Sequence, residues 1–452
     1  MTTVYVRNQR IAPEIALDNG SVVVDLLELP YHSTVTTDID QVIQTVGYAQ
    51  QEARDFALLA LAIYVADKQA LRKYAPDAWR RKFEVYMPVG DVAIWNAAKE
   101  MLEASLEFLT GDEWRLLFRP DHNVISMVTP PFLMTHRPEI VSLFSGGLDS
   151  FIGVIDLLED KHDLLLIGHW DTGITKQAQK RMYDTLNDRY PQKAELLSIR
   201  ATPRKFTPKQ AFPLPNQRQY ETTTRSRSLL FIALGLLAAN ALGRNVPLYV
   251  PENGFISLNV PWNWNRYGSC STRSTHPQFI YSLRVVLHKL GIVNPIVNPY
   301  QFKTKGEMVS SCRNRSLVAS NASQTLSCSH PNVGRWTHLS TGNCGYCLPC
   351  VIRRASLHVI DADKASDYLF DITRNENLVK FENKGATTRS ILRALSRNGN
   401  WLPQLLANGS LNGSTGDVGK AKQLYQKGIV EIRKFLIDKA STEILAFADI
   451  FA

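Results

Sequence analysis

The stretch LFSGGLDSF, residues 143–151, decides the fold. It lies between EIVSLF, which has strand composition, and SFIGVIDLLED, which has helical periodicity. Glycines in a strand-to-helix turn let backbone N–H groups approach an anion, and the helix N-terminus adds a favourable dipole. The turn carries an acid, Asp149, and no lysine, so it is not a Walker A loop. It predicts a phosphate-binding loop of another kind, with a plain helix-capping turn as the alternative.

Strand and helix signals alternate on both sides of this turn. The runs EIVSLFS, HDLLLIGHW, AELLSIR and VPLYVP have strand composition, and helical patterns separate them. This alternation of strands and helices predicts an α/β fold with a doubly wound parallel sheet covered by helices on both faces.

The rest of the chain divides around this sheet. Residues 1–120 predict an N-terminal α+β domain with a structural or partner-binding role, because they contain no recognisable chemistry. Residues 121–137 are rich in proline and predict a linker. Residues 138–362 form the expected catalytic domain, and residues 363–452 predict a helical C-terminal region.

Four of the six cysteines predict a metal site. Cys328 is followed by Cys344, Cys347 and Cys350, the last three with two residues between neighbours. Four thiolates at such spacing suit a structural, tetrahedral Zn²⁺ site, a zinc knuckle. An iron–sulfur cluster and a redox pair of Cys347 and Cys350 are the alternatives.

Charge and hydropathy limit the classes of partner. The net charge of +9 over 452 residues comes from the later part of the chain, because residues 1–80 hold more acidic than basic side chains. A basic excess suits phosphate-bearing ligands, with nucleic acid left open, or is simply a solvated basic surface. No apolar run is long enough to span a bilayer and no signal-peptide core is present, which predicts a soluble, cytoplasmic protein without membrane contact.

The loop and the cysteine motif, in this order, resemble the QueC family of 7-cyano-7-deazaguanine synthases over roughly residues 138–360. Local matches are SGGLDS at 145–150, Arg227 at a helix start, TKGEMV at 304–309 and CGYCLPCVIRR from Cys344. The family belongs to the PP-loop ATP pyrophosphatases, which have a Rossmann-like fold. They cleave ATP between the α and β phosphates and transfer AMP to a substrate oxygen.

The resemblance implies ATP, Mg²⁺ and Zn²⁺ as cofactors and assigns roles to named residues. The ATP-binding set is Ser145, Gly146, Gly147, Leu148, Asp149, Ser150 and Arg227. The catalytic set is Ser145, Asp149, Arg227 and Lys305, in which Asp149 places Mg²⁺ or orients the loop. The four cysteines above are the zinc ligands.

The substrate segments depart from the family pattern, so the substrate end is expected to be rebuilt. The segment after VPLYVP follows a strand end, where ligands bind in doubly wound sheets. Its candidate substrate residues form two groups. Glu252, Asn253 and Asn259 would read a purine-like edge, and Arg266, Arg273 and His276 would hold a carboxylate or phosphates.

The N-terminal unit and the chain length look most like the QueC-like components of bacterial Qat anti-phage defence systems. That resemblance implies a ligase that activates a 7-deazaguanine-type carboxylate as an acyl-adenylate. An amine, expected to belong to a partner protein of the defence operon, then captures it; a homodimer is compatible with this reading.

Three rival functions stay open. They are a housekeeping nitrile synthase that uses ammonia, a tRNA sulfur transferase, and a nucleotide-binding scaffold without turnover. The sulfur transferase would need catalytic cysteines, for which Cys270 and Cys312 are the candidates outside the metal motif.

Overall fold

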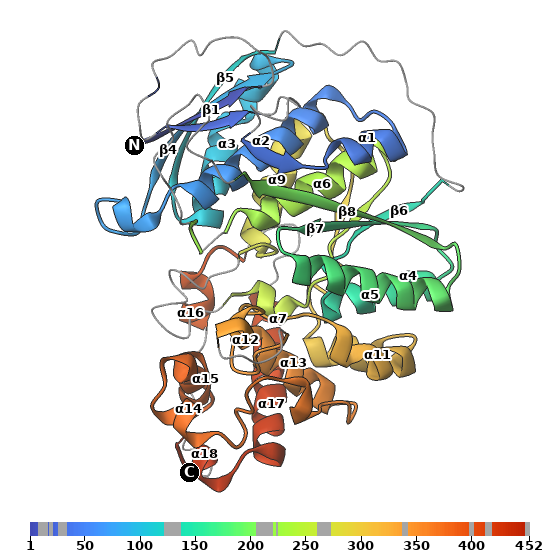
Figure 1. The fold of residues 1–452 in the computed structure, drawn as a ribbon, viewed down its shortest axis with the longest axis vertical. Helices are drawn as coiled ribbons and strands as arrows, with labels where there is room; N and C mark the ends of the chain where they lie inside the picture. The colour runs from blue at the N-terminus through green and yellow to red at the C-terminus, as the bar shows by residue number, and fades with distance from the viewer. Residues whose placement is uncertain are drawn as a thin grey trace.

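The computed structural model contains two β-sheets and a mostly helical C-terminal region (Figure 1). It describes residues 1–7, 17, 21–25, 34–121, 137–204, 220–222, 225–259, 273–336, 342–396, 402–411 and 418–447. The expected linker therefore lies almost entirely outside the described residues.

The larger sheet has the strand order β10-β9-β6-β7-β8-β3. Its strands are β6 (Ile140–Leu143), β7 (Leu164–Trp170), β8 (Ala194–Pro203), β9 (Leu248–Tyr249), β10 (Ile296–Val297) and β3 (Val35–Thr37). All pairings among β6 to β10 are parallel, and only β3 runs antiparallel, on β8. From β6 the chain winds outward first through β7 and β8 and then, on the other side, through β9 and β10. This confirms a doubly wound sheet, and the order reverses between β6 and β9.

Helices cover both faces of this sheet. On one face α4 (Leu148–Glu159) and α5 (Gly173–Arg189) share a core with Ile140, Leu164 and Leu166. On the other face α6 (Arg227–Leu242) packs with the alternate strand residues, Val141, Leu165 and Ile167 among them. Alternation of side chains along each strand explains why the strands are apolar throughout. Figure 1 shows the green strands between these two helical layers.

The smaller sheet corrects the expected class of the N-terminal region. Its order is β2-β1-β4-β5, and every pairing is parallel. The strands are β1 (Thr2–Arg7), β2 (Val22–Asp25), β4 (Lys82–Val89) and β5 (Glu113–Pro120). Helices α1 (Asp40–Val46), α2 (Gln51–Gln69) and α3 (Val92–Thr110) lie between the strands in the chain. A helical crossover returns the chain in the same direction, so this region is α/β and not α+β.

The two sheets share one hydrophobic core. β3 of the N-terminal region is the edge strand of the larger sheet, and α2 packs against α6. A single cluster of buried side chains runs from Val4 on β1 through Phe56 on α2 to Ile296 on β10. Residues 1–120 therefore do not have a separate core, although their role stays a prediction.

The C-terminal region is helical, as expected. Within residues 363–452 its helices are α14 (Glu376–Lys380), α15 (Ala386–Ser396), α16 (Leu402–Ala407), α17 (Val418–Lys439) and α18 (Thr442–Phe447). Between β9 and this region lie α7 (Gly254–Ser257), α9 (Pro277–Lys289), α10 (Lys305–Ser311), α11 (Arg315–Asn321), α12 (Val333–Trp336) and α13 (Leu348–His358). Short 3₁₀ turns occupy Arg72–Tyr74, Ala322–Gln324, Ala365–Asp367 and Asn383–Gly385. Among the described helices, none combines the length and the apolar character needed to cross a membrane.

Candidate functional site at the ends of β6 and β9

The loop at residues 145–150 connects the end of β6 to the start of α4 and is closed by its own hydroxyl groups. The Oγ atoms of Ser145 and Ser150 lie 3.1 Å apart, and Ser145 Oγ accepts a hydrogen bond from Gly147 N at 3.2 Å. Ser150 Oγ donates to Gly147 O at 3.0 Å. α4 begins directly after Gly147 and has no side-chain N-cap. The N-terminus of α4 therefore lies at the loop, and the dipole of the helix favours an anion there.

Gly146 is required by the packing of this loop. Its φ of +78° is in the left-handed region, and a Cβ there would lie 2.8 Å from the backbone nitrogen of Gln179. A larger residue would push the loop away from α5. The loop also contacts the segment before the cysteine motif, because Ser327 Oγ accepts from Leu148 N at 3.0 Å.

Asp149 joins three elements at the point where the strand order reverses. Its Oδ2 accepts hydrogen bonds from Asn253 Nδ2 at 2.8 Å and from Asn253 N at 3.2 Å. Its Oδ1 lies 3.0 Å from Lys305 Nζ, and the two side chains are only 14% and 4% exposed. Asn253 follows β9, and Lys305 begins α10. The fold therefore brings together predicted residues that are up to 156 positions apart in the numbering.

Lys305 is held by the cap of α10 and by the C-terminal helix α17. Thr304 and Glu307 form a capping box at the start of α10. Glu431 of α17 accepts hydrogen bonds from the hydroxyl of Thr304 and, at 3.2 Å, from Gly306 N. Burial raises the pKa of Glu431 to about 6. The helical C-terminal region thus fixes the lysine that faces Asp149.

Glu252 lies beside the pair of Asp149 and Lys305, but its carboxylate is hydrogen-bonded to Thr275. Its carboxylate accepts a hydrogen bond from the hydroxyl of Thr275, and its backbone carbonyl accepts from Asn298 Nδ2 at 2.9 Å. Burial, supported by the charge of Asp149, raises the pKa of Glu252 to about 7. Glu252 is therefore poised to exchange a proton near neutral pH.

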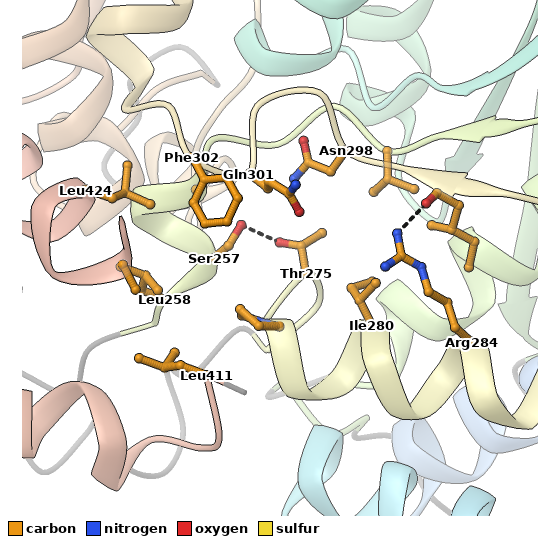
Figure 2. Close-up of a pocket in the computed structure, with 15 residues that line it drawn as sticks. Ser257, Leu258, Thr275, Ile280, Arg284, Asn298, Gln301, Phe302, Leu411 and Leu424 are labelled. Atoms are coloured by element: carbon orange, nitrogen blue, oxygen red, sulfur yellow. Dashed lines mark hydrogen bonds between the residues drawn. The ribbon is translucent and has the colours of Figure 1, made fainter. Parts of the chain in front are cut away.

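A pocket opens on the far side of Thr275 (Figure 2). Its walls come from α7, α9, α17 and the segment after β10. Figure 2 shows the hydrogen-bonded hydroxyls of Ser257 and Thr275 between apolar side chains such as Leu258 and Leu424. An apolar pocket with a few polar groups, next to the end of a central strand, is the usual form of a small-molecule site.

Arg227 lies one strand further along the same edge of the sheet. Its Nε and Nη2 donate to His169 Nδ1 and to the His169 carbonyl, each at 3.2 Å. His169 is on β7, and burial followed by the charge of Arg227 lowers its pKa to about 3, so the imidazole is neutral. Burial would raise the pKa of Asp171, but the charges of Arg227 and Lys68 outweigh it and lower that pKa.

The remaining predicted substrate residues form a separate group near the end of α3. Arg273 Nη1 donates to Phe108 O at 2.8 Å, and His276 packs on the Phe108 ring with centroids 5.1 Å apart. Asn259 Nδ2 donates to Asn408 Oδ1 at 3.4 Å. Arg266 lies outside the described residues, as does Cys270. The five described substrate candidates thus fall into two groups, with Glu252 and Asn253 in one and Asn259, Arg273 and His276 in the other.

Four cysteines cluster where they could bind a metal such as zinc. The Sγ atoms of Cys328, Cys344, Cys347 and Cys350 all lie within 4.8 Å of one another, and none is in a disulfide. Cys328–Cys347 and Cys344–Cys350 are 3.9 Å apart, close to the roughly 3.8 Å that tetrahedral Zn–S bonds of about 2.3 Å require.

The environment of these cysteines also suits a thiolate site. Burial opposes the ionisation of Cys347, but hydrogen bonds from the other three thiols hold the pKa of Cys347 well below its usual range, while hydrogen bonds within the cluster raise the pKa of Cys344 and Cys350. Backbone N–H groups of His330 and Cys344 donate to Cys328 Sγ at 3.2 and 3.3 Å. Such donors stabilise negative sulfur, so the residues present fit a closed metal site.

Three residues near the site, Ser327, Asp171 and Glu431, were not predicted from the sequence. Ser327 directly precedes Cys328, so its place beside a motif was a usable hint. Asp171 directly follows β7, at the end of a strand. Glu431 lies in a helix of ordinary amphipathic pattern, and nothing in its neighbourhood marks it.

Comparison with protein-family models, with curated proteins and with solved structures finds no match for this chain. The arrangement of the site and the sequence resemblance therefore carry the functional argument.

Proposed function

We propose that the protein is an ATP-dependent ligase of the PP-loop pyrophosphatase type, which activates a carboxylate as an acyl-adenylate. The observation that carries this proposal is the position of Asp149. It lies at the reversal of the strand order, inside a glycine-rich turn that opens a helix, and pairs there with Lys305. Anion-binding backbone, a cation and a carboxylate thus meet where doubly wound sheets bind nucleotides.

The proposed reaction has two steps. In the first, a carboxylate oxygen of the substrate attacks the α-phosphorus of ATP, the bond to the bridging oxygen breaks, and pyrophosphate leaves. In the second, an amine attacks the acyl carbon, AMP leaves with the electron pair of the acyl–oxygen bond, and the nitrogen loses a proton. Catalysis is by positioning and by stabilisation of charge on the phosphates.

The loop residues take distinct roles in this scheme. Backbone N–H groups after Gly146 and the hydroxyls of Ser145 and Ser150 would hold the pyrophosphate, and Lys305 would neutralise part of its charge. Asp149 fits Mg²⁺ because its Oδ1 atom is buried and accepts no hydrogen bond in the described structure. The ion would supply further neutralisation of the triphosphate. Arg227, at the end of the neighbouring strand, is the proposed contact for the rest of the nucleotide.

The pocket beside Thr275 is the proposed place for the body of the substrate. The hydroxyls of Ser257 and Thr275 and the amide of Asn298 are polar groups in its wall that would lie beside a flat, polar ring, and leucines would cover the ring faces. Glu252 lies between this pocket and Asp149, through its contact with Thr275. A 7-deazaguanine-type carboxylate with a protein amine as acceptor, in anti-phage defence, is the substrate pair that the sequence resemblance suggests.

Zinc is the proposed occupant of the cysteine cluster, with a structural role. The cluster contributes to the same core as α13 and α17, and α17 carries Glu431. When bound, the ion supplies a cross-link between the segment at Ser327 and α13. It is therefore expected to support the loop and Lys305 indirectly.

The nucleotide products test this proposal. The full-length protein with Mg²⁺ and ATP should yield AMP and pyrophosphate only when a 7-deazaguanine carboxylate is present, and a protein amine should consume the adenylate. ADP as the product would refute the pyrophosphatase assignment. Tight ATP binding without any turnover would favour a nucleotide-binding scaffold, and nitrile formation from ammonia would favour a housekeeping synthase. Transfer of sulfur to tRNA would favour the remaining rival.

A further inference from the structure

Several arginines surround the C-terminal end of α3, at the junction of the two sheets. Arg72 Nη2 and Arg225 Nη1 both donate to Thr110 O, at 3.2 and 2.9 Å, and Arg273 Nη1 donates to Phe108 O. The last carbonyls of a helix have no partner within the helix and attract cations. These helix-end carbonyls explain why arginines gather here. Each carbonyl contact takes up only one or two of the N–H groups of an arginine.

Carboxylates neutralise only part of this group. Asp112 accepts from both Nη atoms of Arg72, at 2.9 and 2.8 Å, and also from Arg81, which in addition pairs with Asp67 at 2.6 Å. Arg225 and Arg273 pair with no carboxylate in the part of the chain that the structure describes. Asp67 meets Arg225 only through the backbone N–H of that residue, at 3.0 Å.

Donors on these two arginines are left without acceptors. Nε and Nη2 of Arg225 and Nε of Arg273 are buried and lack a partner within the described structure, and Arg225 is only 9% exposed. Nε2 of the fully buried His276 is a fourth such atom. Because His276 Nδ1 accepts from Gln278 N, Nε2 carries the proton and is also a donor. Unpaired buried donors of this kind cost free energy and are uncommon.

The positive charge of this arginine pair is only partly compensated. Burial, followed by the charges of Arg72 and Arg273, lowers the pKa of Arg225 to about 10, against the opposing effect of Asp112 and Asp67. Burial lowers the pKa of Arg273 as well. The Trp79 ring lies under the Arg225 guanidinium, 4.7 Å from its centroid, and so fixes its plane without neutralising it. A buried guanidinium is stable when a bound anion completes its hydrogen bonds.

We propose that Arg225 and Arg273 form an oxyanion site, separate from the loop at residues 145–150, that binds a phosphate or carboxylate group of a small molecule. Arg225 is the closed side of this site, and the half-buried Arg273 is the side from which the anion enters. The site does not depend on the proposed ligase activity. Thr275, two residues after Arg273, contacts Glu252, so a group bound here lies near the candidate active site.

Thermal unfolding of the full-length protein in inorganic phosphate, in acetate and in chloride of equal ionic strength tests the site. A ligand that binds only the folded state raises the Tm with the logarithm of its concentration. Phosphate or acetate should raise the Tm beyond chloride, and the anion that does so identifies the source of the oxyanion. Arg225→Lys keeps the positive charge but removes the unpaired guanidinium donors. Arg273→Gln removes the positive charge of the half-buried arginine. Each should weaken the apparent affinity at least tenfold.

Two control variants separate the site from other effects. Arg181→Gln removes an exposed arginine and should leave the response unchanged. Lys305→Met removes the cation beside the loop and should leave intact the part of the response that Arg225→Lys and Arg273→Gln remove, which distinguishes this site from the phosphate loop. Equal responses in the wild type and both arginine variants would mean a general salt effect and would overturn the proposal. A response lost in Lys305→Met but kept in Arg273→Gln would overturn it as well, even if Arg225→Lys did not fold.

Discussion

The ion pair of Asp149 and Lys305 allows a quantitative test of the candidate site. Asp149→Asn keeps the size of the side chain but leaves Lys305, which is 4% exposed, without its counter-charge. The asparagine also has one acceptor atom where the aspartate has two, so it cannot serve both Asn253 and Lys305. Breaking a buried ion pair on one side costs about 3–5 kcal/mol, and we expect about 3 kcal/mol because Asp149 keeps some exposure.

Lys305→Met makes the opposite change and should cost a similar amount, because it leaves the carboxylate unpaired. The double variant removes both charges together, so it should recover about 2 kcal/mol relative to the sum of the single effects. Urea unfolding of the wild type, the two single variants and the double variant measures this coupling. The wild-type pattern of unfolding should be retained throughout, because neither side chain belongs to the main hydrophobic clusters.

Activity should behave differently from stability in the same four proteins. Formation of AMP and pyrophosphate should be lost in all of them except the wild type, since the double variant restores neutrality but not the catalytic groups. Ser145→Ala is the milder comparison, because it removes one hydroxyl contact worth about 1.5–3 kcal/mol when the acceptor is charged. Strictly additive single effects, or full turnover by Asp149→Asn, would refute the reasoning.

Two further predictions concern other parts of the molecule. Cys347→Ser should give insoluble or unfolded protein and lose the metal, since structural zinc contributes directly to folding; elemental analysis of the wild type should find about one zinc per chain, and iron would contradict this assignment. Asp55→Asn should stabilise the protein at pH 7–8, because burial raises the pKa of Asp55 to about 6 and its ionised form is costly, while the asparagine oxygen can still accept from Gly90 N. The folded pKa lies above the unfolded one, so wild-type stability falls as pH rises from about 4 to 6, and the advantage of the variant should grow over that window to at most about 3 kcal/mol. A pH-independent difference, or the same effect in the exposed Asp188→Asn, would contradict this cause.

Local patterns were sufficient for several features of the fold. The glycine turn after an apolar strand predicted the β6–α4 connection, and the alternation of strand and helix predicted a doubly wound sheet. The cysteine spacing predicted the cluster, because a short CxxCxxC segment brings three thiols together without help from distant residues. The N-terminal region was assigned to the wrong class, because periodicity identifies strands but not the direction in which they pair.

Contacts between distant segments could not be read from such patterns. Asp149, Asn253 and Lys305 were each recognised, but only the reversal of strand order between β6 and β9 brings them within hydrogen-bonding distance. Arg273 and His276 were expected beside the substrate with Glu252, yet Arg273 donates to Phe108 O of α3 and His276 packs on the Phe108 ring. Glu431 reaches Thr304 because α17 packs against the rest of the C-terminal helices.

The sequence by itself determined which groups this protein carries close together: a glycine-rich turn, an acid within it, four cysteines at short spacing and a basic excess after residue 80. These follow from residue types at short spacing, where chain geometry leaves few choices. Only the tertiary structure decided which charges meet. Lys305 neutralises Asp149, whereas Arg225 and Arg273 have no carboxylate partner among the described residues, because burial and packing bring side chains together regardless of their separation along the chain.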